Sequence, residues 1–332
     1  MHADDVTGGP DPTPSALDDS ERSGRPTTPA TPIVVAIVGI DPGGIAAAVQ
    51  GAGGVVGPLD EADAAVFLRG GPYPELPDRV RWVQLASAGV ERFLADGIVD
   101  RRRVWTSAVG AYADTVAEHA VALLLAGVRG LVTASRLESW QPAQVAGQVR
   151  GLRGATVTIV GAGGIGRRVA ELLTAFGATV IAVNRSGQEV PEAARTVPSD
   201  QLGSVWAQTD HVVVAAPATA QTRGIIDASV LSHLKPTTWI VNVGRGSLID
   251  TDALVEAVSA GRIAGAALDV TDPEPLPDGH PLWHTPGILI TPHTANPREH
   301  QREVLAQRVA DNLRLFAHGR PLIGVVNLDA GY

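Results

Sequence analysis

The chain has 332 residues, of which 45 % are hydrophobic and 4 % aromatic, and its formal net charge is −9. This length accommodates two domains with cores built mainly from aliphatic side chains. The acidic balance argues against a nucleic-acid-binding protein, which needs a basic surface. The sequence contains no cysteine, which excludes disulfides, thiolate metal sites and a thiol nucleophile, and no metal site is expected. No apolar run approaches the ~18 residues that span a bilayer, and the N-terminus lacks the apolar core of a signal peptide, so we expect a cytoplasmic protein without membrane contact.

The first 32 residues differ in composition from the rest of the chain. They carry six prolines and six acidic residues with almost nothing apolar, which is typical of a disordered tail. From Ile33 onward, short β-branched runs alternate with helix-like stretches. Strands are expected at 33–38, 64–68, 80–85, 155–160, 178–183, 211–216, 237–243, 263–270 and 287–291, and helices at 114–131, 164–176, 252–260 and 298–317. Strands that are apolar on both faces and alternate with helices predict α/β architecture with doubly wound parallel sheets.

A glycine-rich turn lies between the strand at 155–160 and the helix at 164–176. Gly161, Gly163 and Gly166 form G-x-G-x-x-G after a strand and before a helix, which is the context that makes this motif specific for dinucleotides. The first glycine permits a tight turn, the second lets backbone N–H groups approach the pyrophosphate, and the third lets the helix pack on the strand. The phosphates would then lie at the positive end of the helix dipole.

The stretch "VNRSG" (183–187) ends the next strand, where NAD-binding sites carry an acid that accepts bonds from the ribose hydroxyls. Asn184 removes the repulsion that an acid would exert on a 2′-phosphate. Arg185 offers charge-assisted bonds to that phosphate, and Ser186 adds a donor. These residues favour NADP(H). The alternative is that Arg185 stacks on the adenine and that NAD(H) is accepted as well.

Three further stretches each follow a strand: "VNVGRGSLID" (241–250) with Arg245, "ALDVTDPEPLP" (267–277) with Glu274, and "ITPHTANP" (290–297) with His293. Open α/β sheets bind ligands at the carboxyl ends of their strands. Hydride transfer to a 2-oxo acid needs a cation for the carboxylate, a proton donor, and an anion that keeps the donor protonated. Each residue also has an ordinary interpretation, since Arg245 can pair with Asp250 or Asp269, Glu274 can be a solvated loop acid, and His293 is one of nine histidines.

These stretches resemble the D-isomer-specific 2-hydroxyacid dehydrogenase family, in its glyoxylate/hydroxypyruvate reductase-like branch. The matching regions are "GAGGIGRRVAELLTAFGATVIAVNRS", "LKPTTWIVNVGRGSLIDTDALVEAVSAGRIAGAALDVTDPEPL", "ITPHTAN", "SAGVE" and "YADTVAEHAVALLLA". They occur in the family's order and with its spacing, from about Val34 to Leu322.

The resemblance implies a site for each partner of the reaction. Arg245 would bind the substrate carboxylate, His293 would be the general acid in reduction, and Glu274 would hold His293 in its cationic form. The backbone of Ser87, Ala88 and Gly89 and the side chain of Arg69 would contact the substrate, although Arg69 can equally be a surface charge. Asp269 would hold the nicotinamide carboxamide. The cofactor contacts implied in total are Gly161, Gly163, Gly164, Ile165, Gly166, Asn184, Arg185, Ser186, Pro217, Thr222, Val243, Asp269 and Ala295.

The resemblance also implies two Rossmann-like domains with a cleft between them. Residues 33–108 and 297–332 would form a discontinuous substrate domain, with the dinucleotide-binding domain, 109–296, inserted between them. The helix at 114–131 is expected to be too apolar for a free surface and to join two copies in a homodimer. Trp140 lies where some relatives send a tryptophan into the partner's active site, and a purely structural interface role is the alternative.

Two other functions remain open at this point. A 3-phosphoglycerate dehydrogenase would share the site, often with NAD, and the run Arg101-Arg102-Arg103 would be its phosphate contact unless the run simply lies on the surface. Such enzymes often carry a C-terminal regulatory domain, and with roughly 15 residues after the last expected helix we expect none here. A non-catalytic dinucleotide-sensing protein would need the cofactor site alone.

Overall fold

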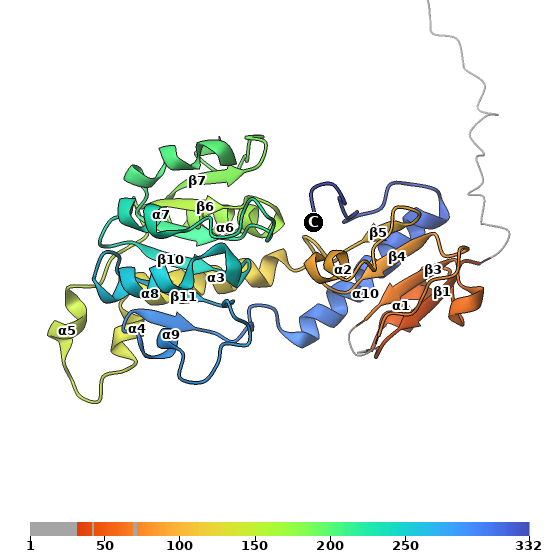
Figure 1. Cartoon of the computed structure of the whole chain (residues 1–332), viewed down its shortest axis with the longest axis horizontal. Coiled ribbons are helices and arrows are strands. Elements are labelled where there is room, and N and C mark those ends of the chain that lie inside the picture. Colours follow the sequence, from red (N-terminus) through yellow and green to blue (C-terminus); the bar gives the residue numbers. More distant parts are fainter. Residues whose placement is uncertain (1–31, 42, 69–71, 332) are drawn as a thin grey trace, which may run out of the picture. The chain divides into compact units, whose positions relative to one another are not determined.

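The computed structural model describes residues 32–41, 43–68 and 72–331. Arg69 and residues 1–31 of the expected tail therefore lie outside the described residues. Two parallel sheets organise the chain from Ile33 onward (Figure 1). This confirms the predicted fold class, in which two α/β units are each built around a parallel sheet.

The first sheet has five strands in the order β2-β1-β3-β4-β5, all parallel. Its strands are β1 (Val34–Val38), β2 (Val55–Val56), β3 (Ala64–Phe67), β4 (Trp82–Leu85) and β5 (Val104–Thr106). The helical segments along this part of the chain are α1 (Ile45–Gly51), the 3-10 turn η2 (Leu59–Glu61) and α2 (Glu91–Ala95). The strand order 2-1-3-4-5 is that of flavodoxin-like doubly wound proteins.

The second sheet has seven parallel strands in the order β12-β11-β10-β9-β6-β7-β8. Its strands are β6 (Thr156–Val160), β7 (Thr179–Asn184), β8 (Arg195–Pro198), β9 (His211–Val214), β10 (Trp239–Asn242), β11 (Gly265–Leu268) and β12 (Ile288–Ile290). Read from β8 to β12 and renumbered with β6 as strand 1, the order is 3-2-1-4-5-6-7. Its first six strands have the classical Rossmann order. The order reverses between β6 and β9, so the ligand-binding switch point lies where these two strands end.

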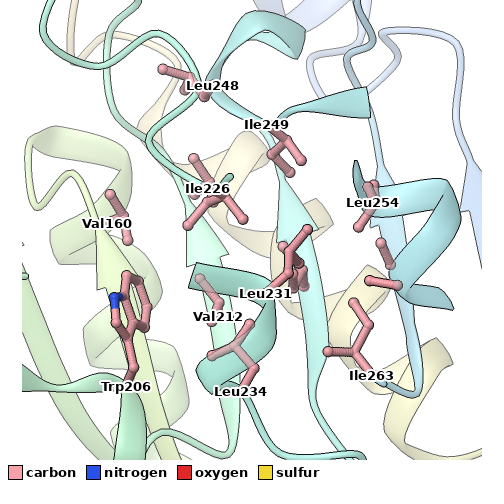
Figure 2. Close-up of a cluster of buried hydrophobic side chains, with 14 of the residues drawn as sticks. Val160, Trp206, Val212, Ile226, Leu231, Leu234, Leu248, Ile249, Leu254 and Ile263 are labelled. Carbon is pink, nitrogen blue, oxygen red and sulfur yellow. The ribbon is translucent and has the colours of Figure 1, made fainter. Parts of the chain in front are cut away.

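The helices of this part cover both faces of the seven-stranded sheet. They are α3 (Ala113–Val128), α4 (Leu131–Ala134), α5 (Pro142–Ala146), α6 (Gly164–Ala175), α7 (Ala228–His233), α8 (Thr251–Ser259) and α9 (Pro281–His284), with the 3-10 turns η3 (Ser199–Ser204), η4 (Trp206–Gln208) and η5 (Gly246–Leu248). Val212 and Val214 of β9 pack in one apolar cluster with α7 and α8, whereas Val213 packs in another with α3 and α6. Figure 2 shows the first cluster, which contains Leu231 of α7 and Leu254 of α8. Alternate residues of one strand are thus buried on opposite faces, which explains the continuous apolar runs in the sequence.

The last helix, α10 (Arg298–Ala317), packs on the five-stranded sheet. Its Leu305, Val309 and Leu313 share an apolar cluster with Val35 and Val66. A buried polar network joins the same elements, because Asn312 of α10 donates to Gln84 Oε1 of β4 at 2.9 Å and Gln84 also accepts from the Thr106 hydroxyl of β5 at 2.9 Å. The first sheet and the last helix therefore share one core.

The apolar helix expected at 114–131 is interrupted near its end. α3 stops at Val128, and Gly130 has φ +68°, a left-handed conformation that favours glycine, before α4 begins at Leu131. Val121 and Leu124 of α3 are buried against the sheet and α6. Packing inside one chain thus accounts for most of the apolarity of α3, and the homodimer stays a prediction. None of the helices in the described part of the chain is long and apolar enough to cross a bilayer.

His211, the first residue of β9, gives the fold a pH dependence. It is buried, its Nδ1 accepts a hydrogen bond from the Trp239 N–H at 3.2 Å, and burial lowers its pKa to about 4. His211 takes up a proton at a higher pH in the unfolded chain than in the folded one. Its contribution to the free energy of unfolding is therefore fully present above about pH 6.5 and is lost as the pH drops toward 4. Between pH 7 and pH 4.5 we expect urea unfolding to show a loss about 2–3 kcal/mol larger for wild type than for His211→Asn. Equal losses in the two proteins would contradict this assignment.

Candidate active site

The glycine turn after β6 has the geometry that a dinucleotide needs. Gly161 has φ +99°, and a Cβ built on it would lie 2.4 Å from the backbone N and Cα of Ala216. A Cβ on Gly166 would lie 2.2 Å from the carbonyl oxygen of Gly161. A Cβ on Gly163, in contrast, would meet no described atom within 4 Å. Two glycines are therefore required by the packing of the turn, and the third keeps open the space in front of α6.

This open space lies at the N-terminus of α6, whose first turn leaves backbone N–H groups without helical partners. Gly164 and Ile165 supply two of them. An N-terminal helix dipole and free N–H groups form a natural anion site, so the turn fits the pyrophosphate of a nicotinamide dinucleotide. Of the expected cofactor contacts, Gly163 and Gly164 are exposed and Gly166 is buried beneath them.

The stretch 183–187 forms a turn in which two side chains make hydrogen bonds to the backbone of the same loop. Asn184 Oδ1 accepts from the Gly187 N–H at 2.7 Å, and Asn184 Nδ2 donates to the Gln188 carbonyl at 2.7 Å. The Ser186 hydroxyl accepts from the Gln188 N–H at 3.2 Å. Asn184 therefore shapes the loop that follows β7, while Arg185 and Ser186 are exposed on it.

The loop after β9 lies on the other side of the switch point and is closed by Thr222. Its hydroxyl donates to the Pro217 carbonyl at 2.6 Å and accepts from the Thr219 N–H at 2.8 Å. Val243 lies next to this loop, because its N–H donates to the Val214 carbonyl at 3.0 Å. Pro217 and Thr222 thus lie at the same edge of the sheet as the glycine turn, and their contact with the cofactor stays a prediction.

Arg245, Glu274 and His293 follow β10, β11 and β12, three neighbouring parallel strands. The Arg245 carbonyl accepts from Asn242 Nδ2 at 2.9 Å, which fixes the start of η5. A Cβ on Gly246 would lie 1.9 Å from the backbone of Thr271, so the loop carrying Arg245 packs directly on the loop that leads to Glu274. The structure therefore brings the loops of all three residues to one edge of the sheet.

His293 and Glu274 form a close pair. His293 Nδ1 lies 2.6 Å from Glu274 Oε1, and both side chains are about half exposed. Nδ1 must donate, because an ionised carboxylate only accepts hydrogen bonds. His293 has φ +53°, and among the described residues it alone has a positive φ without being glycine. Such conformations cost free energy and occur at functional sites.

Asp269 anchors the loop that carries His293. Its carboxylate is 3 % exposed and accepts hydrogen bonds from the Thr291 hydroxyl at 2.6 Å, the Thr294 N–H at 2.9 Å and the Ala295 N–H at 3.2 Å. His119 Nε2 of α3 lies 3.3 Å from Asp269 Oδ1. Burial opposes ionisation of Asp269, but these hydrogen bonds outweigh it and hold its pKa below the ordinary value. Sequence reasoning missed His119, for which the only signal was a histidine inside an otherwise apolar helix.

The expected substrate loop approaches Arg245. A Cβ on Gly89 would lie 1.8 Å from Arg245 Nη2 and 2.5 Å from Glu91 Oε2, so the backbone of Gly89 lies directly against both side chains. Among the described residues, the N–H groups of Ser87, Ala88 and Gly89 have no hydrogen-bond acceptor. Arg245 Nε also lies 3.2 Å from Glu91 Oε1, a partner that sequence reasoning did not identify. The alternative in which Arg245 pairs with Asp250 or Asp269 is not formed, because Asp250 caps α8 and Asp269 holds the 291–295 loop.

The three arginines at 101–103 each form an ion pair with an aspartate of the same chain. Arg101 pairs with Asp329 at 2.5 Å and Arg102 with Asp78 at 3.3 Å. Arg103 is buried, pairs with Asp100 and donates to the Leu76 carbonyl at 2.7 Å. Each arginine therefore already has an acidic partner, which makes the run a poor phosphate site.

Comparison with known proteins agrees with this geometry. Residues 121–295 match the NAD-binding domain of the D-isomer specific 2-hydroxyacid dehydrogenases. This chain is 37 % identical to the glyoxylate reductase of Aeropyrum pernix, over 67 % of this chain and 69 % of that enzyme. It is 32 % identical to the D-3-phosphoglycerate dehydrogenase of Mycobacterium tuberculosis, over 76 % of this chain but 48 % of that enzyme. A solved NADPH-dependent glyoxylate/hydroxypyruvate reductase from Sinorhizobium meliloti, in complex with NADP and sulfate, superposes with a TM-score of 0.74 at 27 % identity, over 91 % of this chain and 100 % of that one. The chain belongs to the D-isomer specific 2-hydroxyacid dehydrogenase family and is an oxidoreductase that uses a nicotinamide dinucleotide.

Proposed function

We propose that this enzyme reduces a small 2-oxo acid of the glyoxylate or hydroxypyruvate type to the D-2-hydroxy acid, with NADPH preferred over NADH. The observation that carries the proposal is the His293–Glu274 pair at 2.6 Å, on loops that share one sheet edge with the loop of Arg245. The similarity to glyoxylate reductases, one of them solved with NADP, supports the substrate class and the cofactor.

The substrate carboxylate would be held by Arg245 together with the backbone N–H groups of Ser87, Ala88 and Gly89, which have no acceptor among the described residues. A guanidinium and backbone N–H groups both donate to carboxylate oxygens, and charge-assisted bonds of this kind are about twice as strong as neutral ones. Arg245 Nη2 already lies against Gly89, so one anion can contact both elements. This arrangement would fix the position of the neighbouring carbonyl.

The proton would come from His293. Glu274 occupies Nδ1, so the ring presents Nε2 to the substrate. Bound NADPH would supply the hydride to the carbonyl carbon. As negative charge develops on the carbonyl oxygen, Nε2–H donates its proton there and the product hydroxyl forms.

The cofactor preference follows from the turn after β7. No carboxylate stands at residue 184 to accept from a ribose hydroxyl or to repel a 2′-phosphate. Asn184 is engaged in closing the turn, so the exposed Arg185 and Ser186 would provide the phosphate contacts.

Replacing Arg185 with alanine tests this preference. We expect the KM for NADPH to rise about tenfold or more and the KM for NADH to change less than about threefold, because only NADPH carries the phosphate that Arg185 would bind. Arg195→Ala, at the start of β8 and away from the strand end, is the control and should leave both constants unchanged. A parallel change in both KM values for Arg185→Ala would contradict the assignment.

A kinetic panel tests the proposed function itself. Glyoxylate, hydroxypyruvate, pyruvate, bulkier 2-oxo acids and 3-phosphohydroxypyruvate would each be offered with NADPH and with NADH. We expect the highest kcat/KM for glyoxylate or hydroxypyruvate with NADPH. A preference for 3-phosphohydroxypyruvate with NADH would replace the proposal by a phosphoglycerate dehydrogenase, which the ion-paired arginines 101–103 disfavour. Cofactor binding without turnover of any 2-oxo acid would point to a sensing protein.

A further inference from the structure

We propose that His119 is a positioning residue for the general acid, acting through Asp269 and Thr291. The inference rests on the proposed function, since it concerns the loop that carries His293. His119 lies on α3, far from β12 in sequence, yet its Nε2 is 3.0 Å from Thr291 Oγ1 and 3.3 Å from Asp269 Oδ1.

The hydrogen-bond directions assign a role to each partner. The Thr291 hydroxyl donates its only hydrogen to Asp269 Oδ1 at 2.6 Å, so Thr291 Oγ1 can only accept from His119. Asp269 is ionised and also accepts. Because both atoms facing Nε2 are acceptors, Nε2 carries a hydrogen and donates to the Thr291–Asp269 pair.

This pair controls the backbone on both sides of His293. Asp269 Oδ1 accepts from Thr291 and from the Thr294 N–H, and Asp269 Oδ2 accepts from the Ala295 N–H. The His293 N–H itself donates to the backbone carbonyls of Asp269 and Thr291, both at 2.9 Å. The left-handed φ of +53° at His293 is therefore maintained by contacts on either side of it.

His119 is the donor side chain that α3 adds to this anchor. Among the described residues, no arginine or lysine pairs with Asp269. A buried carboxylate without enough donors is unfavourable and seeks other partners. Removal of His119 would then allow Asp269 and Thr291 to shift, and the loop with His293 would shift with them.

Two substitutions at position 119 separate positioning from general structural damage. His119→Leu removes the donor, whereas the Nε2 amide of His119→Gln restores one. We expect His119→Leu to lower kcat for 2-oxo acid reduction at least about tenfold, with the KM for the 2-oxo acid within about threefold of wild type, since misplacement of a catalytic group affects the chemical step. His119→Gln should recover most of kcat. Thr115→Val is the matched control, because it removes a bond from the same helix to Asn296, beyond the anchored stretch.

Hydrogen exchange of the 288–297 segment supplies a readout that does not depend on turnover. The Thr294 and Ala295 amides should exchange faster in His119→Leu than in wild type, and should be protected again in His119→Gln. Unchanged kcat and unchanged exchange in His119→Leu would overturn the inference, as would equal losses in both His119 variants. If wild type reduces no 2-oxo acid, the proposed function fails, whereas the exchange comparison still decides the role of His119 in the loop.

Discussion

Replacing His293 with alanine is expected to lower kcat for 2-oxo acid reduction by about 10³-fold, because general acid catalysis by a positioned side chain contributes ~10²- to 10⁴-fold. NADPH binding should stay within about twofold of wild type, since the side chain faces Glu274 and its removal leaves the glycine turn intact. Steady-state kinetics and a fluorescence titration of NADPH measure the two quantities.

A second substitution and a control sharpen this test. Glu274→Gln keeps a hydrogen-bond acceptor at His293 Nδ1 but loses the negative charge, so it should retain more activity than His293→Ala. His284→Ala, at an exposed histidine of α9, should behave as wild type. Survival of turnover within tenfold in His293→Ala would assign the proton donor to another group.

Arg245→Gln is expected to reduce kcat/KM for the 2-oxo acid by about 10³-fold, because truncating one partner of a desolvated charge pair costs ~2–5 kcal/mol. Arg245→Lys keeps the charge but loses the planar fork, and should recover only part of the loss. The measurement is kcat/KM at subsaturating substrate, with NADPH binding as the check on folding.

The same experiment also tests the ion pair that Arg245 forms with Glu91 in the enzyme without substrate. Glu91 Oε1 lies 3.2 Å from Arg245 Nε, so loss of the guanidinium also leaves an acid unpaired beside the substrate loop. The double variant Arg245→Gln with Glu91→Gln should therefore bind the 2-oxo acid somewhat better than Arg245→Gln alone. Arg262→Gln, an exposed arginine paired with Glu256, is the control for general effects of charge. Activity of Arg245→Gln within threefold of wild type would exclude Arg245 as the carboxylate site.

The parts of the site that could be predicted from the sequence are those fixed by local backbone geometry. Gly161 has a positive φ within the turn, and a Cβ on Gly166 would meet the Gly161 carbonyl oxygen, so both glycines are favoured by one strand-turn-helix unit, although a Cβ on Gly161 would also meet Ala216 after β9. The common position of the three strand ends could also be predicted, because parallel strands place their carboxyl ends at one edge of the sheet whatever the details of packing. His293 and Glu274 are 19 residues apart, and their contact follows from that rule.

Other features depend on contacts that no short stretch of sequence reveals. His119 and Asp269 are brought together only when α3 packs across the sheet, and Glu91 reaches Arg245 from α2, which follows a strand of the first sheet. The sequence shows that residue 184 is asparagine and not an acid. It does not show the hydrogen bonds of Asn184 to Gly187 and Gln188, because these depend on the conformation of the following turn. The apolarity of α3 suggested a partner chain, but Gly127 meets the Trp239 ring of the same chain, where a Cβ would lie 2.3 Å away.

The packing of α10 on the first sheet has a consequence for biosynthesis. The apolar cluster under β1 and β3 needs Leu305, Val309 and Leu313, and Gln84 needs Asn312, so this half of the molecule lacks part of its interior until the ribosome has made the last helix. The seven-stranded half, in contrast, is encoded by one uninterrupted stretch and can fold while synthesis continues. A released chain that ends before residue 298 should therefore contain a protease-resistant Rossmann unit preceded by a protease-sensitive segment. The nucleotide site would then be complete before the elements that present the substrate.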